Sequence, residues 1–167
     1  MQPQTRSEWA AAVRARPLAE LLQCPPGTGD LLSGAAQRLD MEAAEIVFRQ
    51  SEVCKGLYVV ASGRFLRRTV RLETCVLLGV ARAGELVELA AVLGDGRHTY
   101  TLTSQTDGSV VLLPMEALSR AFEAYPRMRM QLLEELARQV SRGYDASCQS
   151  RRFKAQGRGY GAGAAQA

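Results

Sequence analysis

The stretch Ile46-Val-Phe-Arg-Gln-Ser-Glu-Val-Cys-Lys-Gly-Leu-Tyr-Val-Val-Ala-Ser-Gly63 decides the fold. With the preceding Glu45 it makes two short apolar runs, Glu45–Arg49 and Gly56–Gly63, separated by a polar segment. Short runs rich in Val, Ile, Tyr and Phe between turn residues are typical of β-strands. The pattern therefore predicts two strands joined by a loop, with Gly63 closing the second.

Similar runs follow at intervals of about 8–12 residues, a spacing typical of sandwiches and barrels. They are Phe65–Leu72, Cys75–Ala81, Tyr100–Ser104 and Ser109–Leu113. In the first of them apolar and basic residues alternate, so we expect its arginines on a solvent-facing edge that discourages aggregation. The sequence predicts an α+β, mainly β fold: a double-stranded β-helix or jelly-roll barrel with short flanking helices.

Helical patterns lie on both sides of these strands. We expect a helix at Ser7–Leu22 and a break at Cys24–Gly29, where prolines and glycines cluster. Asp30 is a candidate cap for a second short helix that reaches Leu39. After Pro114 the sequence predicts a helix at Met115–Ala124.

A longer helix opens at Pro126, because proline fits a first helical position. Its apolar residues recur three or four apart and form a narrow stripe of the coiled-coil kind. The stripe predicts a dimerisation helix over Met128–Ser147, and the alternative is packing against the chain's own barrel. The candidate dimer residues are Leu133, Leu136, Ala137, Val140 and Tyr144.

Composition excludes several classes of protein. Four basic residues near the C-terminus account for the whole net charge of +4, so the core domain is close to neutral. A neutral domain is not expected to carry a strongly basic face that binds nucleic acid. No apolar run approaches the roughly 20 residues that span a bilayer, and no secretory signal precedes residue 16, so we expect a cytoplasmic protein without membrane contact.

Metal and enzyme chemistry are not expected either. The four cysteines form no CxxC pair and His98 is the single histidine, so we expect separate reduced thiols and no metal site. No nucleophile elbow, HExxH motif or paired carboxylate signature is present, so we expect no enzyme.

The expected organisation is a helical segment at 1–27, a β-barrel at 28–125, a dimerisation helix at 126–152 and a disordered basic tail, rich in glycine and alanine, at 153–167.

The stretch quoted at the start resembles the opening strands of the Crp/Fnr-type cyclic-nucleotide-binding domain. It keeps the family's Phe48, Tyr58 and Gly63, with Ser51 where a turn glycine is expected. Ser109–Leu118 is similar to the last strand entering the next helix, and the likeness covers about residues 28–150. The resemblance implies a regulatory sensor related to transcription regulation, acting as a homodimer on a small-molecule effector.

Gly84–Thr101 resembles the family's phosphate-binding cassette, in which a short helix presents N–H groups to a cyclic phosphate. The candidate ligand-binding residues are Gly84, Glu85, Leu86, Glu88, Leu89, Arg97, His98 and Thr99.

Two registers onto the cassette are open. In the first, Glu88 holds the ribose of cAMP or cGMP, Arg97 pairs with the phosphate and Thr99 adds a hydroxyl. In the second, Glu88 replaces the cassette glycine and Leu89 replaces the glutamate, and a cyclic nucleotide binds poorly. The second register is favoured slightly. For His98 the alternative to a pocket position is an exposed loop imidazole.

Full-length members of the family continue into a winged helix-turn-helix, for which Arg151–Ala167 has no helical apolar pattern. We therefore expect a stand-alone, divergent domain that does not itself bind a specific DNA sequence. The alternative function is a ligand-free dimerisation or protein-interaction module that has lost nucleotide binding.

Overall fold

The structure is a computed structural model that describes the backbone of residues 18–156 and the side chains of residues 18–143. The chain divides into two compact units, residues 1–133 and 134–167. None of the helices in the described residues is long and apolar enough to cross a membrane.

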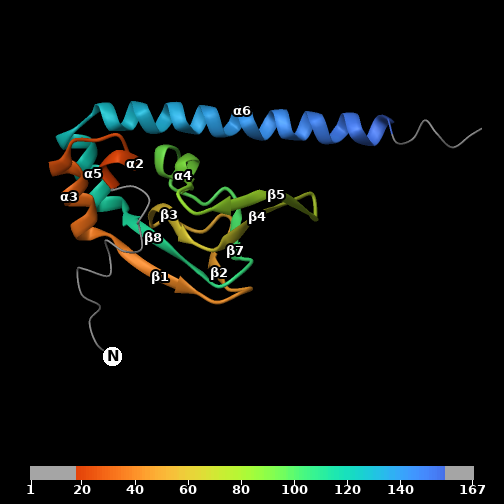
Figure 1. Cartoon of the computed structure of the whole chain (residues 1–167), viewed down its shortest axis with the longest axis horizontal. Helices are drawn as coiled ribbons and strands as arrows, with labels where there is room; N and C mark the ends of the chain where they lie inside the picture. The colour runs from red at the N-terminus through yellow and green to blue at the C-terminus, as the bar shows by residue number, and fades with distance from the viewer. Residues whose placement is uncertain (1–17, 157–167) are drawn as a thin grey trace, which may run out of the picture. The chain divides into compact units, whose positions relative to one another are not determined.

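Within the described residues, eight strands form the body of the first unit, and Figure 1 shows how they are arranged. They are β1 (Gln37–Met41), β2 (Ile46–Phe48), β3 (Gly56–Ser62), β4 (Arg64–Arg71), β5 (Thr74–Arg82), β6 (Leu86–Val87), β7 (Thr101–Ser104) and β8 (Gly108–Pro114). Their pairing gives two four-stranded antiparallel sheets, in the orders β1-β8-β3-β6 and β2-β7-β4-β5. The predicted mainly β jelly roll is confirmed, but the strands make two sheets rather than a closed barrel.

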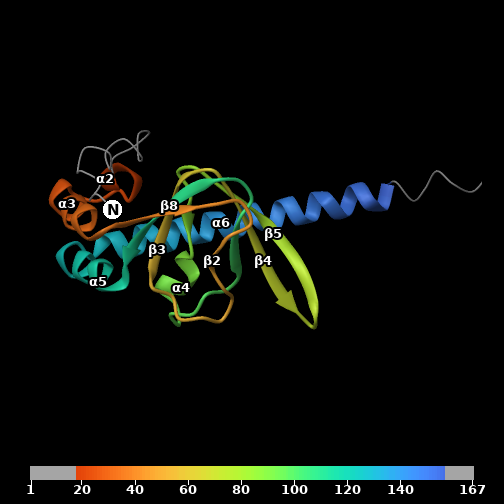
Figure 2. The same cartoon turned by 90° about the horizontal axis from the view of Figure 1, so that it is seen from below.

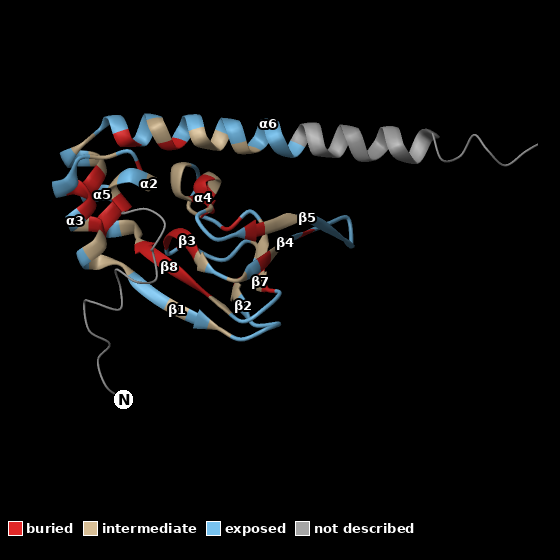
Figure 3. Cartoon of the chain, in the orientation of Figure 1, coloured by how far each residue is buried: buried red, intermediate tan, exposed pale blue. Residues whose placement is uncertain are grey.

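The two sheets share one apolar core, because each strand alternates inward and outward side chains. The cluster takes Phe48 and Phe65 from one sheet and Tyr58 and Val110 from the other, with β3 and β8 buried along most of their length (Figure 3). Val60, Ala81, Val87, Leu102 and Leu112 complete it.

The helices in the described residues are α2 (Leu18–Leu21), α3 (Pro26–Ala35), α4 (Leu89–Leu93), α5 (Met115–Ala124) and α6 (Arg127–Gln156). α5 has the predicted bounds and packs against α3. α6 begins at Arg127, one residue after the predicted start at Pro126, and it continues through residues 153–156, which were predicted to belong to the disordered tail.

The prediction for the N-terminal segment was partly wrong. Of the predicted helix at residues 7–22, only Leu18–Leu21 is described as helical, and the residues before 18 lie outside the described part. Glycines and prolines predicted a break at residues 24–29, but α3 already begins at Pro26. Pro26 fits a first helical position, and Gly29 lets α3 approach α2 so closely that an added Cβ would lie 2.7 Å from Ala19 Cβ.

Two further predictions about this segment are wrong. Asp30 lies inside α3 instead of capping it, and Leu39 belongs to strand β1. β1 is a five-residue edge strand whose two apolar residues, Leu39 and Met41, are only partly buried, so its alternation was too short to recognise in the sequence.

Strands β4 and β5 form a two-stranded ribbon that extends beyond the other strands (Figure 2). Arg71 pairs with Thr74, so Leu72 and Glu73 make a two-residue turn, and both have positive φ, of 47° and 62°. β4 lies between β7 and β5, which corrects the expectation that its arginines line a sheet edge. The edge is β5, which exposes Cys75, Val76, Leu77 and Leu78.

Candidate functional site

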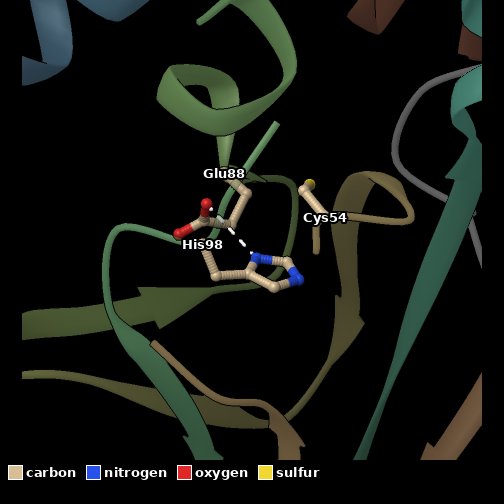
Figure 4. Close-up of side chains that lie close together, drawn as sticks. All are labelled: Cys54, Glu88 and His98. Carbon is tan, nitrogen blue, oxygen red and sulfur yellow. Dashed lines mark ion pairs between the residues drawn. The ribbon is translucent and has the colours of Figure 1, made fainter. Parts of the chain in front are cut away.

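Three segments of the first unit meet at one buried point (Figure 4). The loop between β2 and β3 contributes Cys54, the residue before α4 contributes Glu88, and the segment before β7 contributes His98. One ligand atom from each of these residues lies within 4.8 Å of those of the other two, and all three residues are buried.

A short antiparallel ladder sets the direction of these side chains. Val53 and Arg97 form its bridge, Cys54 N donates to Gly96 O at 2.8 Å, and His98 N donates to Glu52 O at 2.9 Å. Because side chains alternate along paired strands, Cys54 and His98 share one face and Val53 and Arg97 share the other. Burial agrees: Val53 is 68% exposed, Arg97 is exposed, and Cys54 and His98 are buried.

Glu88 adopts a backbone conformation that favours glycine. Its φ of 74° and ψ of 28° place it in the left-handed region, immediately before α4. Its side chain is fully buried, and its carboxylate accepts hydrogen bonds from Thr99 N at 3.3 Å and Thr99 Oγ1 at 3.2 Å. The backbone N–H of Glu88 donates to Tyr100 Oη at 3.3 Å.

His98 lies between this carboxylate and an aromatic ring. Its Nδ1 is 3.3 Å from Glu88 Oε2, and its imidazole stacks on Phe48 with ring centroids 3.8 Å apart and planes within 5°. Nδ1 is nevertheless buried without a hydrogen-bond partner, because the approach to Oε2 lacks hydrogen-bond geometry. The alternative of an exposed loop imidazole is therefore wrong.

Burial determines the protonation of this pair. It raises the pKa of Glu88 from 4.5 to about 7, although the hydrogen bonds from Thr99 and the charge of Arg67 act in the opposite direction. Burial also lowers the pKa of His98 and raises the pKa of the Cys54 thiol. At neutral pH the imidazole is therefore uncharged, and Glu88 is close to its midpoint between acid and carboxylate.

The other candidate ligand residues surround this point without all facing it. Gly84 has a φ of 86°, and its N–H donates to Val60 O. Glu85 Oε2 pairs with Arg67 Nη2 at 3.0 Å. Leu86 and Leu89 are buried on either side of Glu88.

Arg97 does not join Glu88. Its guanidinium is turned outward, and Nη1 donates to Ser51 O at 3.0 Å. Ser51, where the family's turn glycine was expected, has a φ of 69°, so this turn keeps the glycine-like backbone without the glycine. The conformation of Glu88 likewise favours the register in which it replaces the cassette glycine.

Cys54 and Phe48 are site residues that sequence reasoning missed. In the sequence Phe48 indicates only the family's first strand. Cys54 lies 34 residues before Glu88 and 44 before His98, and this spacing matches no metal-binding motif. Among the described residues, Cys24, Cys54 and Cys75 form no disulfide, and Cys148 lies outside the described side chains.

Two facing four-stranded sheets, with a short helix inserted between β6 and β7, define a class of small jelly-roll domains. Within this class the chain belongs to the cyclic nucleotide-binding domain family, whose model matches residues 38–125, more than half of the sequence. The recognition made from Phe48, Tyr58 and Gly63 is thereby confirmed. A search of the curated proteins finds no match to the sequence.

Solved structures agree on the fold. The catabolite activator protein of Thermus thermophilus is 24% identical, with a TM-score of 0.66, over 83% of this chain and 64% of that chain. The sensor domain of the transcriptional regulator DNR of Pseudomonas aeruginosa is 18% identical, with a TM-score of 0.66, over 83% of this chain and 93% of that chain.

A third similar structure is the regulatory domain of Toxoplasma gondii PKA with cAMP, which is 17% identical, with a TM-score of 0.63, over 71% of this chain. This chain spans 46% of that chain and 64% of the Thermus protein. At these levels of identity the likenesses show the fold of this chain.

Proposed function

We propose that this chain is a regulatory sensor domain that takes a small effector at the cassette Gly84–Thr101 and signals as a dimer through α6. The observation that carries the proposal is the buried group at the start of α4, where Glu88 and His98 occupy the interior of the cassette. A buried carboxylate and imidazole are costly in a core and are typical of functional sites.

The effector that we propose is not a cyclic nucleotide. A cyclic phosphate approaching α4 would meet Glu88, and a negative charge there repels it. Arg97, the cation that the first register assigned to the phosphate, faces away and donates to Ser51 O. Both features favour the second register, in which cAMP and cGMP bind poorly.

Isothermal titration calorimetry tests this part of the proposal. We expect no heat when millimolar cAMP or cGMP is added to the folded chain. Saturable heat that disappears in Arg97→Ala would contradict it and favour the first register. Val53→Ala is the matched control, because Val53 is the exposed bridge partner of Arg97.

The dimer proposal rests on the predicted seam. Leu133 and Val140 are exposed on α6 at 39% and 64%, Ala137 is exposed and Leu136 is half-buried. Tyr144, the last predicted seam residue, lies outside the described side chains. Large apolar side chains in a narrow helical stripe suit a second copy of the same helix.

Sedimentation analysis tests the seam. We expect the wild type to sediment as a dimer and Val140→Arg to sediment as a monomer, because a buried unpaired charge opposes association. Glu134→Arg is the control, since it reverses an exposed charge beside the stripe. A Val140→Arg chain with the sedimentation of the wild type would contradict the seam.

A ligand-free interaction module is the second candidate. The stacking of Phe48 on His98 favours it, because the chain's own side chains then fill the cassette. One measurement separates the two functions. If the chain is a sensor, an effector that binds the cassette changes its melting temperature or its sedimentation coefficient. If the chain is a ligand-free module, added small molecules change neither quantity.

A further inference from the structure

We propose that Cys54, Glu88 and His98 form a binding site for one zinc ion. The inference deepens the proposed function, because the ion would then be the effector at the cassette. The binding of zinc is argued from the site itself, and only the ion's regulatory role rests on the proposed function.

The three donors suit zinc in chemistry and in spacing. Thiolate, imidazole and carboxylate are the groups that bind Zn²⁺ in proteins, at about 2.0–2.3 Å, which puts ligand atoms about 3.5 Å apart around a tetrahedral ion. Glu88 Oε2 and His98 Nδ1 already lie 3.3 Å apart. Each of the three donors lies within 4.8 Å of the other two. The Cys54 thiol now donates to Gly56 O at 3.2 Å, and binding an ion exchanges that hydrogen bond for a metal–sulfur bond.

A second observation points independently to a ligand. His98 Nδ1 is buried without a hydrogen-bond partner, in a side chain that is 2% exposed, and the imidazole is aimed at the Glu88 carboxylate (Figure 4). Buried polar groups in proteins are nearly always satisfied, so an unpaired nitrogen in this position needs an explanation. A bound cation supplies one, because neutral imidazole nitrogen is a metal ligand.

The charges also balance. Zinc binding displaces one proton from the Cys54 thiol and one from any Glu88 that is protonated, and the thiolate and carboxylate then neutralise the two positive charges of the ion. Neutral histidine adds no charge. The resulting buried site has no net charge, which is what a low-dielectric interior favours.

Neighbouring side chains hold the donors in place, as the partners of metal ligands commonly do. Thr99 binds both carboxylate oxygens of Glu88, and Phe48 fixes the plane of the His98 ring. The ion would join the β2–β3 loop, the start of α4 and the segment before β7. Three protein ligands leave a fourth position open for water or a further ligand.

Zinc titration of the full chain, reduced and freed of metal by a chelator, tests the site. We expect one zinc ion per chain. We also expect Cys54→Ser and His98→Ala each to weaken binding by more than the roughly 10–100-fold that loss of an outer hydrogen-bond partner costs. Cys75→Ser and Cys24→Ser are the matched controls and keep the wild-type affinity. Binding that is unchanged in Cys54→Ser would overturn the proposal.

Cobalt binding by the wild type provides a readout that needs no variant. Co²⁺ replaces Zn²⁺ in such sites, and a Cys54 thiolate ligand would give a sulfur-to-cobalt absorption band in the wild type. We expect this band to persist in a chain with Cys24, Cys75 and Cys148 all changed to serine. Absence of the band from the wild type would overturn the site, and so would its loss from a triple variant that keeps the circular dichroism and melting temperature of the wild type.

The metal site and the proposed function can fail separately. A chain that binds zinc but sediments identically with and without it keeps the site and loses the effector role. A chain that dimerises through α6 and binds no zinc loses the site and keeps the proposed function. Mg²⁺ and Ca²⁺ are the further control, since these hard cations avoid thiolate.

Discussion

Glu88 combines two unfavourable features at one position. It is a carboxylate with a fully buried side chain, and its backbone lies in the left-handed region, which costs a non-glycine residue about 1–2 kcal/mol. The two hydrogen bonds from Thr99 offset part of the burial. A residue kept at such a cost indicates a role beyond packing.

Glu88 should make the stability of the metal-free chain fall with rising pH. Its pKa is about 7 when folded and 4.5 when unfolded, so between these values the folded chain holds more protons and loses stability as the pH rises. Glutamine does not titrate. We expect the free energy of unfolding of Glu88→Gln, relative to wild type, to increase by about 2–3 kcal/mol between about pH 5 and 8.

Urea unfolding at the two pH values, with a chelator present, measures this difference. The groups around Glu88 that could also titrate are His98, Cys54 and Tyr100, and they are present in both proteins, so their contributions largely cancel. Glu123→Gln, an exposed glutamate of α5, is the control. A difference between Glu88→Gln and wild type that does not change with pH would contradict the prediction.

The sequence located the cassette but not its contacts. The resemblance selected Glu88, Leu89, Arg97 and His98 as candidate site residues. It also allowed a register in which Arg97 pairs with a phosphate. Which of them faces inward depends on the bridge between Val53 and Arg97, a pairing across 44 residues that local sequence does not specify. The same long-range pairing brings Cys54 into the site.

At the scale of elements, the two-residue turn between β4 and β5 carries residues that do not suit it. Positive φ at both turn positions is typical of a type I′ turn, for which Asn-Gly is preferred. Leu72 is 99% exposed and makes no compensating packing. The turn is a place where stability can be gained without touching the site.

We expect the double variant Leu72→Asn, Glu73→Gly to be more stable than wild type by about 1 kcal/mol. The variant relieves the backbone strain of two non-glycine residues at positive φ, and the greater entropy of glycine in the unfolded chain offsets part of that gain. Chemical denaturation measures the change. Leu72→Val should move stability in the opposite direction, because a β-branched residue at positive φ is more strained. A loss of stability in the Asn-Gly variant would contradict this account of the turn.

Elements with long apolar runs or a clear helical period were predicted nearly to the residue. β3, β8 and α5 are examples, since most of their residues face the core or a neighbouring element. β1 and β6 were missed because the first has only two partly buried apolar residues at the edge of its sheet and the second has two residues in all. Pairing with β8 and β3 makes them strands, and pairing partners are not local information.

At the scale of the molecule, one core joins both sheets of the first unit. Leu102 of β7 is fully buried in that core, between strands β2 and β4 of its sheet. We expect Leu102→Ala to lower the free energy of unfolding by about 2–5 kcal/mol, because truncation leaves a cavity. Leu77→Ala, on the exposed edge strand, should change it by about 0.5 kcal/mol or less.

Unfolding followed by circular dichroism and by tyrosine fluorescence measures both variants. The two signals should change together, because the shared cluster takes side chains from both sheets. Separate transitions for the two signals, or equal losses for Leu102→Ala and Leu77→Ala, would contradict the shared core.

The open side of β5 has a practical consequence for handling the protein. Its unpaired backbone groups, beside a run of exposed apolar side chains, can accept a strand from a neighbouring molecule in concentrated solution. Cys75 lies on that strand with its thiol exposed, so air oxidation could convert a reversible contact into a permanent cross-link. Fresh reductant during concentration and storage is therefore a structural requirement for keeping samples homogeneous.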